Sequence, residues 1–448
     1  MSARTAISRR QPAYFTFLKF QEVDYYMETT RQHAIIVGVQ LQNDTNFAYS
    51  MEELRNLAAA CNITVIGELS QKASRINPSH YLGTGKIQEL SMLVEDEDTL
   101  IIFNDELAPS QIRNLESSLD RQVIDRTILI LNIFADRAKT KEAQLQVEVA
   151  QLQYMLPRLN GMRESLGRQG GGSGLKNRGA GETKLELDRR RIEERITALE
   201  TELQGQVERR QIQRRQRHKN EVPVVCLVGY TNAGKSSLLN AMVETYHPGS
   251  NKQVFAKNML FATLETSVRS IRLPDHKTFL LTDTVGFVSQ LPHHLVKAFR
   301  STLEEVTEAD LLIHVVDASD PQHEQHMAVT SETLKALGAD GIPTVYAYNK
   351  SDLTDRAYPA VEGGTITISA RQSSGISELT GLIRSHVFND YIQCEILVPF
   401  DRGSIVSYFN EHAHVQEVSY EEQGTRLRLE CRAADYERFR GDFVELSH

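Results

Sequence analysis

The sequence contains few cysteines and no long apolar run. Its four cysteines lie far apart, with neither a Cys-x-x-Cys pair nor the Cys/His spacing of a zinc site, so free thiols in a reducing cytosol are expected: Cys61, Cys226, Cys394 and Cys431. No stretch approaches the roughly 18 consecutive apolar residues that a membrane-spanning helix needs. The aromatic run Tyr14–Phe20 is interrupted by Lys19 and lacks a small-residue cleavage site, so we predict no signal peptide. These absences favour a cytoplasmic protein with no membrane span.

An excess of basic residues is also missing. The 448 residues include 50 Lys and Arg against 59 Asp and Glu, a net charge of −9, which argues against binding of nucleic acid by bulk charge alone. Hydrophobic residues at 40% and charged residues at 24% are the balance of an ordinary globular protein. At roughly 100–200 residues per domain, the length predicts about three domains.

The N-terminal part of the chain has the pattern of an α/β domain. Residues 1–30 lack sustained periodicity and are expected to form a loosely packed lead-in. Between residues 31 and 135, apolar runs alternate with helical patterns, which predicts a parallel sheet. The expected strands are Ala34–Leu41, Ile63–Leu69, Thr99–Asn104 and Gln122–Asp125, and the expected helices are Met51–Ala60, Ile87–Val94 and Pro109–Leu119.

Residues 136–221 have a different pattern, which predicts a helical hairpin. Two apolar stripes repeat at alternating spacings of four and three residues, one from Leu145 to Leu159 and one from Ile192 to Leu203. Such stripes are typical of two antiparallel helices packed like a short coiled coil. The joining segment Gly167–Gly181 holds seven glycines in fifteen residues. We predict a non-helical loop there, because each glycine costs a helix about 1 kcal/mol relative to alanine.

Basic residues concentrate in the same region. Residues 161–220 contain 15 Lys and Arg against 9 Asp and Glu, a local charge of +6 that leaves −15 for the remainder of the chain. The arginines of Asp188–Arg191 and Arg209–Lys219 dominate this charge. Two interpretations remain open: a solvated helix face with ion pairs four residues apart, or a surface that contacts phosphates.

The segment that follows carries a phosphate-binding motif. The buried-strand pattern Val224–Val228 runs directly into a Gly-x4-Gly-Lys-Ser sequence, and Ser237–Met242 continues as a helix. Lys235 should neutralise the β- and γ-phosphates, and the Ser236 hydroxyl should ligate Mg²⁺. The glycines let backbone N–H groups point inward and the helix N-terminus adds positive charge, so eight residues are expected to bind phosphates: Gly229, Tyr230, Thr231, Asn232, Ala233, Gly234, Lys235 and Ser236.

Three later motifs indicate that the base is guanine. One apolar strand ends in Asp283-Thr284-Val285-Gly286, where the carboxylate can hold Mg²⁺ through water and the Gly286 N–H can sense the γ-phosphate. Another runs into Asn349-Lys350-Ser351-Asp352, and a carboxylate at Asp352 can accept both N1–H and the exocyclic amine of guanine. A third is followed by Ser369-Ala370-Arg371, which places a backbone N–H for the guanine O6. We therefore predict a P-loop GTP-binding domain with a mainly parallel sheet at residues 222–388.

These motifs resemble the HflX family of ribosome-associated GTPases, in the translation-factor class. Tyr81–Lys86, Asn104–Leu107 and Asp125–Thr127 also resemble that family, and the segment from Asp283 matches its second switch. The first switch is matched around five residues that the resemblance assigns to nucleotide binding: Phe261, Ala262, Thr263, Leu264 and Glu265. Residues 391–448 look like the small C-terminal domain of many members, and their mixed strand and helix patterns predict an α+β fold.

The resemblance also implies an activity and partners. It implies GTP hydrolysis, with Mg²⁺ at Ser236 and Thr263 and catalytic roles for Lys235, Thr263 and Gly286. A protein that is monomeric when free would bind the large ribosomal subunit and its rRNA, and dissociate or rescue stalled or idle ribosomes. Two alternatives stay open: a GTP-gated regulator of a protein partner such as a protease, and a GTPase for ribosome assembly or RNA modification.

Three positions allow two interpretations each. Phe287 stands where many GTPases carry a water-orienting glutamine, which implies slow intrinsic hydrolysis, but it is equally compatible with simple core packing. Asn232 either helps to bind K⁺, as in potassium-activated relatives, or caps the phosphate loop. Gly83–Lys86 resembles a second phosphate loop, but His80 occupies the place of its first glycine, so a turn that begins a helix is preferred.

Overall fold

The computed structural model describes residues 32–42, 44–94, 96, 98–159, 178–219, 222–248, 267–289 and 305–446. The lead-in, residues 160–177 with most of the glycine-rich segment, and the first switch with Thr263 lie outside the described residues. The chain divides into two compact units, one from residues 1–133 and 151–194 and the other from residues 134–150 and 195–448.

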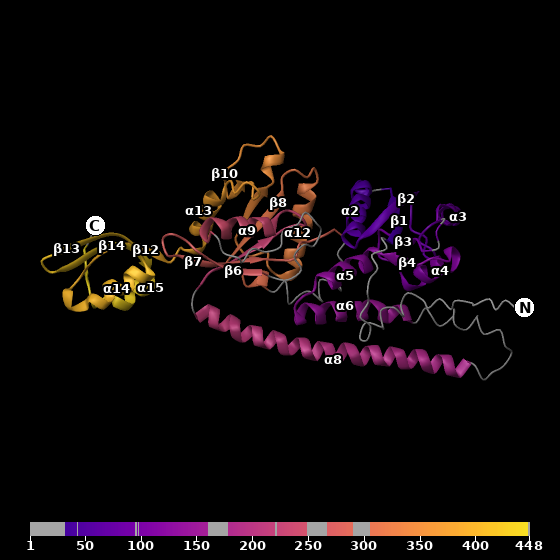
Figure 1. Cartoon of the computed structure of the whole chain (residues 1–448), viewed down its shortest axis with the longest axis horizontal. Helices are drawn as coiled ribbons and strands as arrows, with labels where there is room; N and C mark the ends of the chain where they lie inside the picture. Colours follow the sequence, from indigo (N-terminus) through magenta and orange to yellow (C-terminus); the bar gives the residue numbers. More distant parts are fainter. Residues whose placement is uncertain are drawn as a thin grey trace, which may run out of the picture. The chain divides into compact units, whose positions relative to one another are not determined.

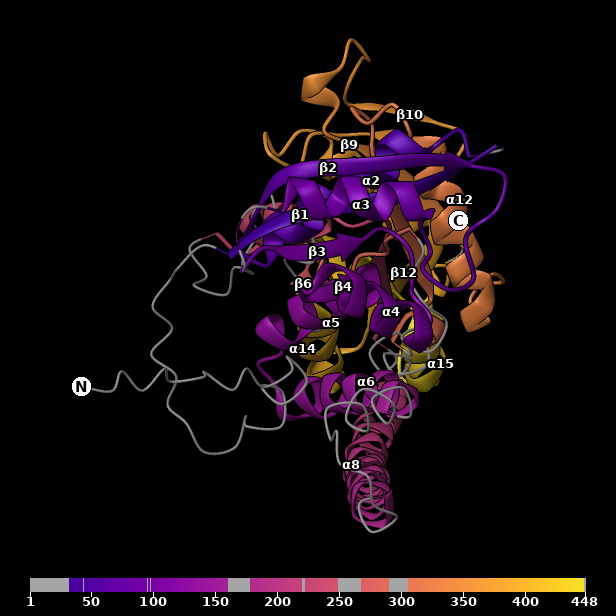
Figure 2. The same cartoon turned by 90° about the vertical axis from the view of Figure 1, so that its right-hand side faces the viewer.

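The first unit contains the predicted parallel sheet. Its strand order is β2-β1-β3-β4, which can be followed in Figure 2. The strands are β1 (Gln32–Leu41), β2 (Ile63–Ala73), β3 (Leu100–Phe103) and β4 (Val123–Asp125), and the helices are α2 (Phe47–Ala60), α3 (Thr84–Leu93), α4 (Pro109–Leu119) and α5 (Arg126–Arg137). β1 is buried from Ala34 to Val39, because helices pack on both faces of the sheet and both sets of alternating side chains are apolar. Gly83 precedes α3, so Gly83–Lys86 begins a helix, as predicted.

A buried polar network joins α2, β3 and α5 in the first unit. Arg126, at the start of α5, is 2% exposed and forms an ion pair with the buried Glu53 of α2. Its Nη1 also donates to Asn104 Oδ1 at 3.0 Å, and Asn104 Nδ2 donates to Ser50 Oγ at 2.8 Å. A buried charge is tolerated only when it is paired and hydrogen-bonded, so these contacts explain a fully buried arginine.

Two long helices, α6 (Lys141–Leu159) and α8 (Arg178–Lys219), form the predicted hairpin (Figure 1). Within the second unit, Glu148 pairs with Arg195 at 2.8 Å and Lys141 pairs with Glu202 at 3.6 Å, so the helices run antiparallel. The prediction of a loop up to Gly181 was wrong at its end, since α8 begins at Arg178. Extending a helix that is already nucleated adds one hydrogen bond per residue, which offsets the cost of glycine in a first turn. None of the helices in the described ranges is long and apolar enough to cross a membrane.

The second unit contains a seven-stranded sheet in the order β10-β11-β9-β8-β5-β7-β6. The five inner strands are parallel and the two edge strands pair antiparallel, because β6 and β10 are each joined to a neighbour by a short hairpin. The helices are α9 (Lys235–Tyr246), α12 (His323–Leu337) and α13 (Ile376–Val387). The strands are β5 (Val224–Val228), β6 (Ser267–Arg272), β7 (Thr278–Asp283), β8 (Leu311–Asp317), β9 (Thr344–Asn349), β10 (Ala360–Glu362) and β11 (Thr365–Thr367).

The C-terminal residues of the second unit form an antiparallel sheet in the order β13-β14-β12-β15. Two helices, α14 (Gly403–His412) and α15 (Ala433–Phe439), lie on one face of it, coloured yellow in Figure 1. The expected α+β fold is confirmed, but two of its strands, β13 and β15, had not been predicted. β13 is exposed along most of its length and has no alternating apolar pattern, and β15 has only two residues, both exposed. The strands are β12 (Tyr391–Val398), β13 (His414–Glu421), β14 (Gly424–Arg432) and β15 (Val444–Glu445).

Candidate nucleotide-binding site

The phosphate-loop motif lies between β5 and α9, where the sequence placed it. Gly229 has φ of +142°, and a Cβ there would lie 2.3 Å from the Val315 carbonyl oxygen. Gly234 has φ of +97°, and a Cβ there would lie 2.2 Å from Asn349 Nδ2. Both positions therefore require glycine for conformation and for space. Asn232 has a left-handed φ of 61°, which asparagine tolerates, so its presence in the loop is explained without a bound ion.

Lys235 begins α9 and lies inside this loop. Its side chain is buried, and Nζ donates to the carbonyl oxygens of Gly229 at 3.0 Å and Tyr230 at 2.8 Å. Burial lowers the pKa of Lys235 to about 8, while the charge of Asp283 acts in the opposite direction. Burial and the charge of Lys235 also lower the pKa of His314 on β8 to about 4, so that imidazole is neutral near pH 7. The lysine is thus the principal positive charge at the phosphate loop.

The residues expected to hold magnesium lie together. Ser236 Oγ donates to Asp283 Oδ2 at 2.6 Å, and Asp283 is fully buried at the end of β7. A hydroxyl beside a carboxylate is the hard-oxygen donor set that suits Mg²⁺, so these two side chains fit the ion. Among the described residues, no group of three or more His, Cys, Asp or Glu side chains could hold a metal. Thr263, the other expected ligand, lies outside the described residues.

The segment after Asp283 packs directly on the phosphate loop. A Cβ on Gly286 would lie 2.7 Å from Thr231 Cα and 3.1 Å from Lys235 Nζ, so only glycine fits against the loop. The Thr231 N–H donates to the Phe287 carbonyl oxygen at 2.7 Å, and the Phe287 N–H donates to the Gly229 carbonyl oxygen at 3.1 Å. Thr284 Oγ1 donates to the Leu227 carbonyl oxygen at 2.6 Å, and Val285 is buried.

The residues expected to bind guanine also converge. Asn349 ends β9, donates to the Ala233 carbonyl oxygen at 3.0 Å and accepts the Ala370 N–H at 2.9 Å, so one side chain ties the phosphate loop to the Ser369–Arg371 loop. Asp352 Oδ1 accepts the Ser369 hydroxyl at 2.7 Å, which orients the carboxylate. Ser351 is fully buried and Arg371 is exposed. The Ala370 N–H already has an acceptor in Asn349, so a guanine O6 would share that donor or use another.

Asp317 is a residue of this region that the sequence did not single out. It ends β8 beside Asn349, and its Oδ2 accepts Lys350 Nζ at 2.6 Å. Lys350 has a left-handed φ of 61°, so the ion pair holds a strained residue between Asn349 and Asp352. An acidic residue at the carboxyl end of a strand adjacent to the guanine motif was the available signal.

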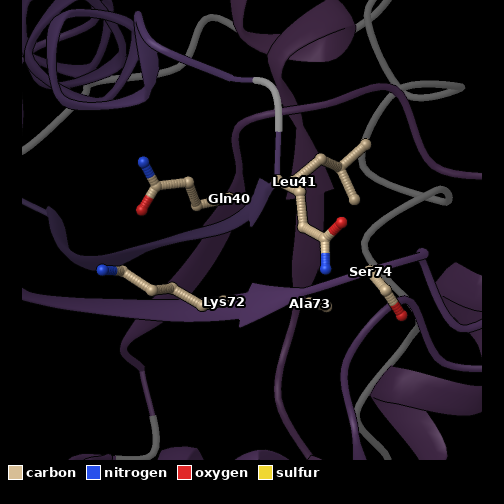
Figure 3. Close-up of a pocket in the computed structure, with 6 residues that line it drawn as sticks. Gln40, Leu41, Lys72, Ala73 and Ser74 are labelled. Atoms are coloured by element: carbon tan, nitrogen blue, oxygen red, sulfur yellow. The ribbon is translucent and has the colours of Figure 1, made fainter.

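A separate cavity of about 330 Å³ lies at the carboxyl ends of β1 and β2 in the first unit (Figure 3). In parallel sheets, ligands bind where the strand order reverses, which here is between β1 and β3. The cavity has one charged lining residue, Lys72, and is displaced from that point, so no ligand is assigned to it. It is lined by Gln40, Leu41, Gln42, Lys72, Ala73 and Ser74.

Three known family models match consecutive parts of the chain. Residues 48–135 match the GTP-binding GTPase N-terminal family, and residues 137–217 match the GTP-binding GTPase middle region. Residues 224–350 match the family described as 50S ribosome-binding GTPase. A solved GTP-binding protein of Sulfolobus solfataricus in complex with GDP is 23% identical, with a TM-score of 0.42, covering 80% of this chain and 99% of that one.

Curated relatives match nearly the whole chain. GTPase HflX of Caldanaerobacter subterraneus is 42% identical over 432 residues, which are 96% of this chain and 99% of the relative. GTPase HflX of Escherichia coli is 34% identical over 415 residues, which are 91% of this chain and 95% of the relative. With this similarity and a P-loop GTPase fold, the chain belongs to the HflX family of GTPases and hydrolyses GTP.

Proposed function

We propose that this GTPase is a nucleotide-operated switch that binds the large ribosomal subunit and dissociates stalled or idle ribosomes. The observation that supports the switch is the packing of Gly286 on the phosphate loop. A Cβ added to Gly286 would lie only 3.1 Å from Lys235 Nζ. A γ-phosphate held by Lys235 lies next to that backbone, so its arrival and loss act directly on the segment after Asp283. The ribosome enters the proposal because the model matched by residues 224–350 is described as 50S ribosome-binding.

Within this proposal, each part of the site has one task. The loop N–H groups and Lys235 bind the phosphates. The Asp352 carboxylate selects guanine by accepting hydrogen bonds from its N1–H and its exocyclic amine. Ser236 and Thr263 would hold Mg²⁺, with Asp283 acting through water, and the ion would neutralise negative charge on the phosphates. The Gly286 N–H donates to a γ-phosphate oxygen. If K⁺ activates this GTPase, as in potassium-activated relatives, Asn232 is the residue that binds the ion.

The ion pairs of the described arginines of α8 indicate which part of this helix could contact rRNA. Arg189 pairs with Glu193 and Arg190 with Glu194, each at 2.9 Å, and Arg191 lies 3.6 Å from Asp188. These contacts are the ion-paired helix face that was one of the two open interpretations, and the acidic partners offset the positive charge. We therefore assign contact with RNA phosphates to the second cluster, Arg209–Lys219, whose side chains lie outside the described residues.

Salt-dependent sedimentation with purified large subunits tests the proposal. The full chain should pellet with subunits more strongly with a non-hydrolysable GTP analogue than with GDP, and pelleting should weaken as salt rises. Equal pelleting with both nucleotides would contradict a switch, and no pelleting would leave a protein partner as the better alternative. In the test variant, four arginines of the second cluster are replaced by Ala: Arg209, Arg210, Arg214 and Arg215.

The control variant removes the same number of positive charges from the same helix. It replaces four arginines that have acidic partners: Arg189, Arg190, Arg191 and Arg195. Loss of pelleting in the test variant and retention in the control supports the assigned surface. Equal loss of pelleting in both variants would mean that only total charge matters. Unchanged pelleting in both variants would show that neither arginine cluster contacts the subunit.

A further inference from the structure

The side chain of Phe287 packs in the core, although this residue occupies the position where many GTPases carry a water-orienting glutamine. It is 3% exposed and packs in a core cluster with Cys226, Val228 and Leu312. The core-packing interpretation of Phe287 is therefore the one that the structure favours. The segment after Asp283 consequently meets the phosphate loop through its backbone, and any catalytic geometry there depends on what fixes that backbone.

Tyr230, the second residue of the phosphate loop, holds the backbone of the segment after Asp283 through its side-chain hydroxyl. Its hydroxyl accepts the Ser289 N–H at 2.7 Å and forms a 2.6 Å hydrogen bond with Ser289 Oγ. A short parallel bridge also pairs Tyr230 with Phe287. Residues 286–289 are thus held at both ends, by the close approach of Gly286 to Thr231 and by the tyrosine hydroxyl at Ser289.

The ring of Tyr230 is itself held in place by α12. His326 stacks on it with ring centroids 3.8 Å apart and an interplanar angle of 9°, and His326 is buried. Stacked rings restrict the tyrosine to one rotamer, so its hydroxyl has a defined position. Tyr230 therefore connects three elements that are distant in sequence: the phosphate loop, the segment after β7 and α12.

We infer that Tyr230 is a positioning residue for GTP hydrolysis, acting through its hydroxyl on Ser289 and thereby on the Gly286 backbone. Donors aimed at developing charge accelerate a reaction only if they are fixed before it occurs, and misplacement by about 1 Å can reduce a rate by about 100-fold. With Phe287 in the core, no side chain at this position orients the attacking water, so the catalytic geometry depends on the backbone of the segment after Asp283. The tyrosine hydroxyl holds the other end of the segment, at Ser289.

Removing only the hydroxyl tests this role in the full chain. In Tyr230→Phe the ring still stacks on His326, so we expect GTP turnover under saturating nucleotide to fall about tenfold, while GDP affinity changes by less than about twofold. The matched control is Tyr246→Phe, which removes a hydroxyl that donates to Thr380 Oγ1 at 2.9 Å elsewhere in the second unit. Thermal unfolding of both variants is measured in parallel, and the control should retain full turnover.

Variants of His326 and Ser289 distinguish a positioning role of Tyr230 from a general disruption of the phosphate loop. His326→Ala removes the stack and should lower turnover, whereas His326→Phe keeps an aromatic ring and should restore most of it. Ser289→Ala combined with Tyr230→Phe should be no slower than Tyr230→Phe alone, because both act on one contact. Unchanged turnover in Tyr230→Phe would overturn the inference, and so would a proportional loss of GDP affinity and turnover. Additive losses in the double variant would also overturn it.

Discussion

Raising the pH should weaken nucleotide binding through the loss of charge on Lys235. The side chain is buried in the phosphate loop, and its pKa is lowered from the ordinary 10.5 to about 8. A bound di- or triphosphate places negative charge beside the ammonium group and restores its protonated form. Binding therefore takes up a proton wherever the free protein has lost it, so affinity falls as pH rises above the pKa of the free site.

The magnitude follows from that pKa alone. With a pKa of about 8, the neutral fraction of Lys235 in the free protein is roughly 0.1 near pH 7, 0.5 near pH 8 and 0.9 near pH 9. Affinity should fall about twofold between pH 7 and pH 8 and about tenfold between pH 7 and pH 9, a loss of about 1.4 kcal/mol. His314, with a pKa of about 4, is neutral throughout this range and does not contribute.

Calorimetry measures the proton directly. GDP titrated into the full chain near pH 8, in two buffers of different ionisation enthalpy, should give an uptake of about half a proton per site. GMP is the control, because its single phosphate does not extend to the lysine, and its uptake should be close to zero. Equal heats in both buffers, together with constant GDP affinity from about pH 7 to about pH 8.5, would refute the buried-lysine reasoning.

Two further predictions concern specific side chains. Asp352→Asn should lose the carboxylate that we propose pairs with guanine, and should shift the preference toward xanthine nucleotides by at least about tenfold in a competition assay. An unchanged preference would remove Asp352 from base recognition. Glu53→Gln should leave Arg126 buried without its anionic partner and destabilise the first unit by about 3–5 kcal/mol, with faster hydrogen exchange in β1. Adding Arg126→Met should recover part of that loss, and a further loss instead would show that the pair is not coupled.

The sequence predicted the parallel strands of the two sheets, most clearly those that are buried on both faces. The antiparallel edge strands β6 and β10 were not predicted, and most of their residues are partly or fully exposed. Ala34–Val39 and Val224–Val228 are continuous apolar runs, and such runs are recognisable without knowledge of their neighbours. The exposed strand β13 had no such signal, since its pairing with β14 is made by backbone groups that every residue carries. The start of α8 at Arg178 also differs from the predicted end of the loop, because the glycine content of Gly167–Gly181 does not encode the length of the helix that follows.

The sequence by itself determined the phosphate loop and predicted the two motifs that the structure brings beside it, Asn349–Asp352 and Ser369–Arg371. Those motifs are short, and local backbone geometry confines their glycines and lysine to fixed places. Only the tertiary structure decided that Phe287 lies in the core and that Tyr230 contacts both Ser289 and His326. The direction of a side chain depends on packing between segments that are far apart along the chain, and no spacing within either segment encodes that packing.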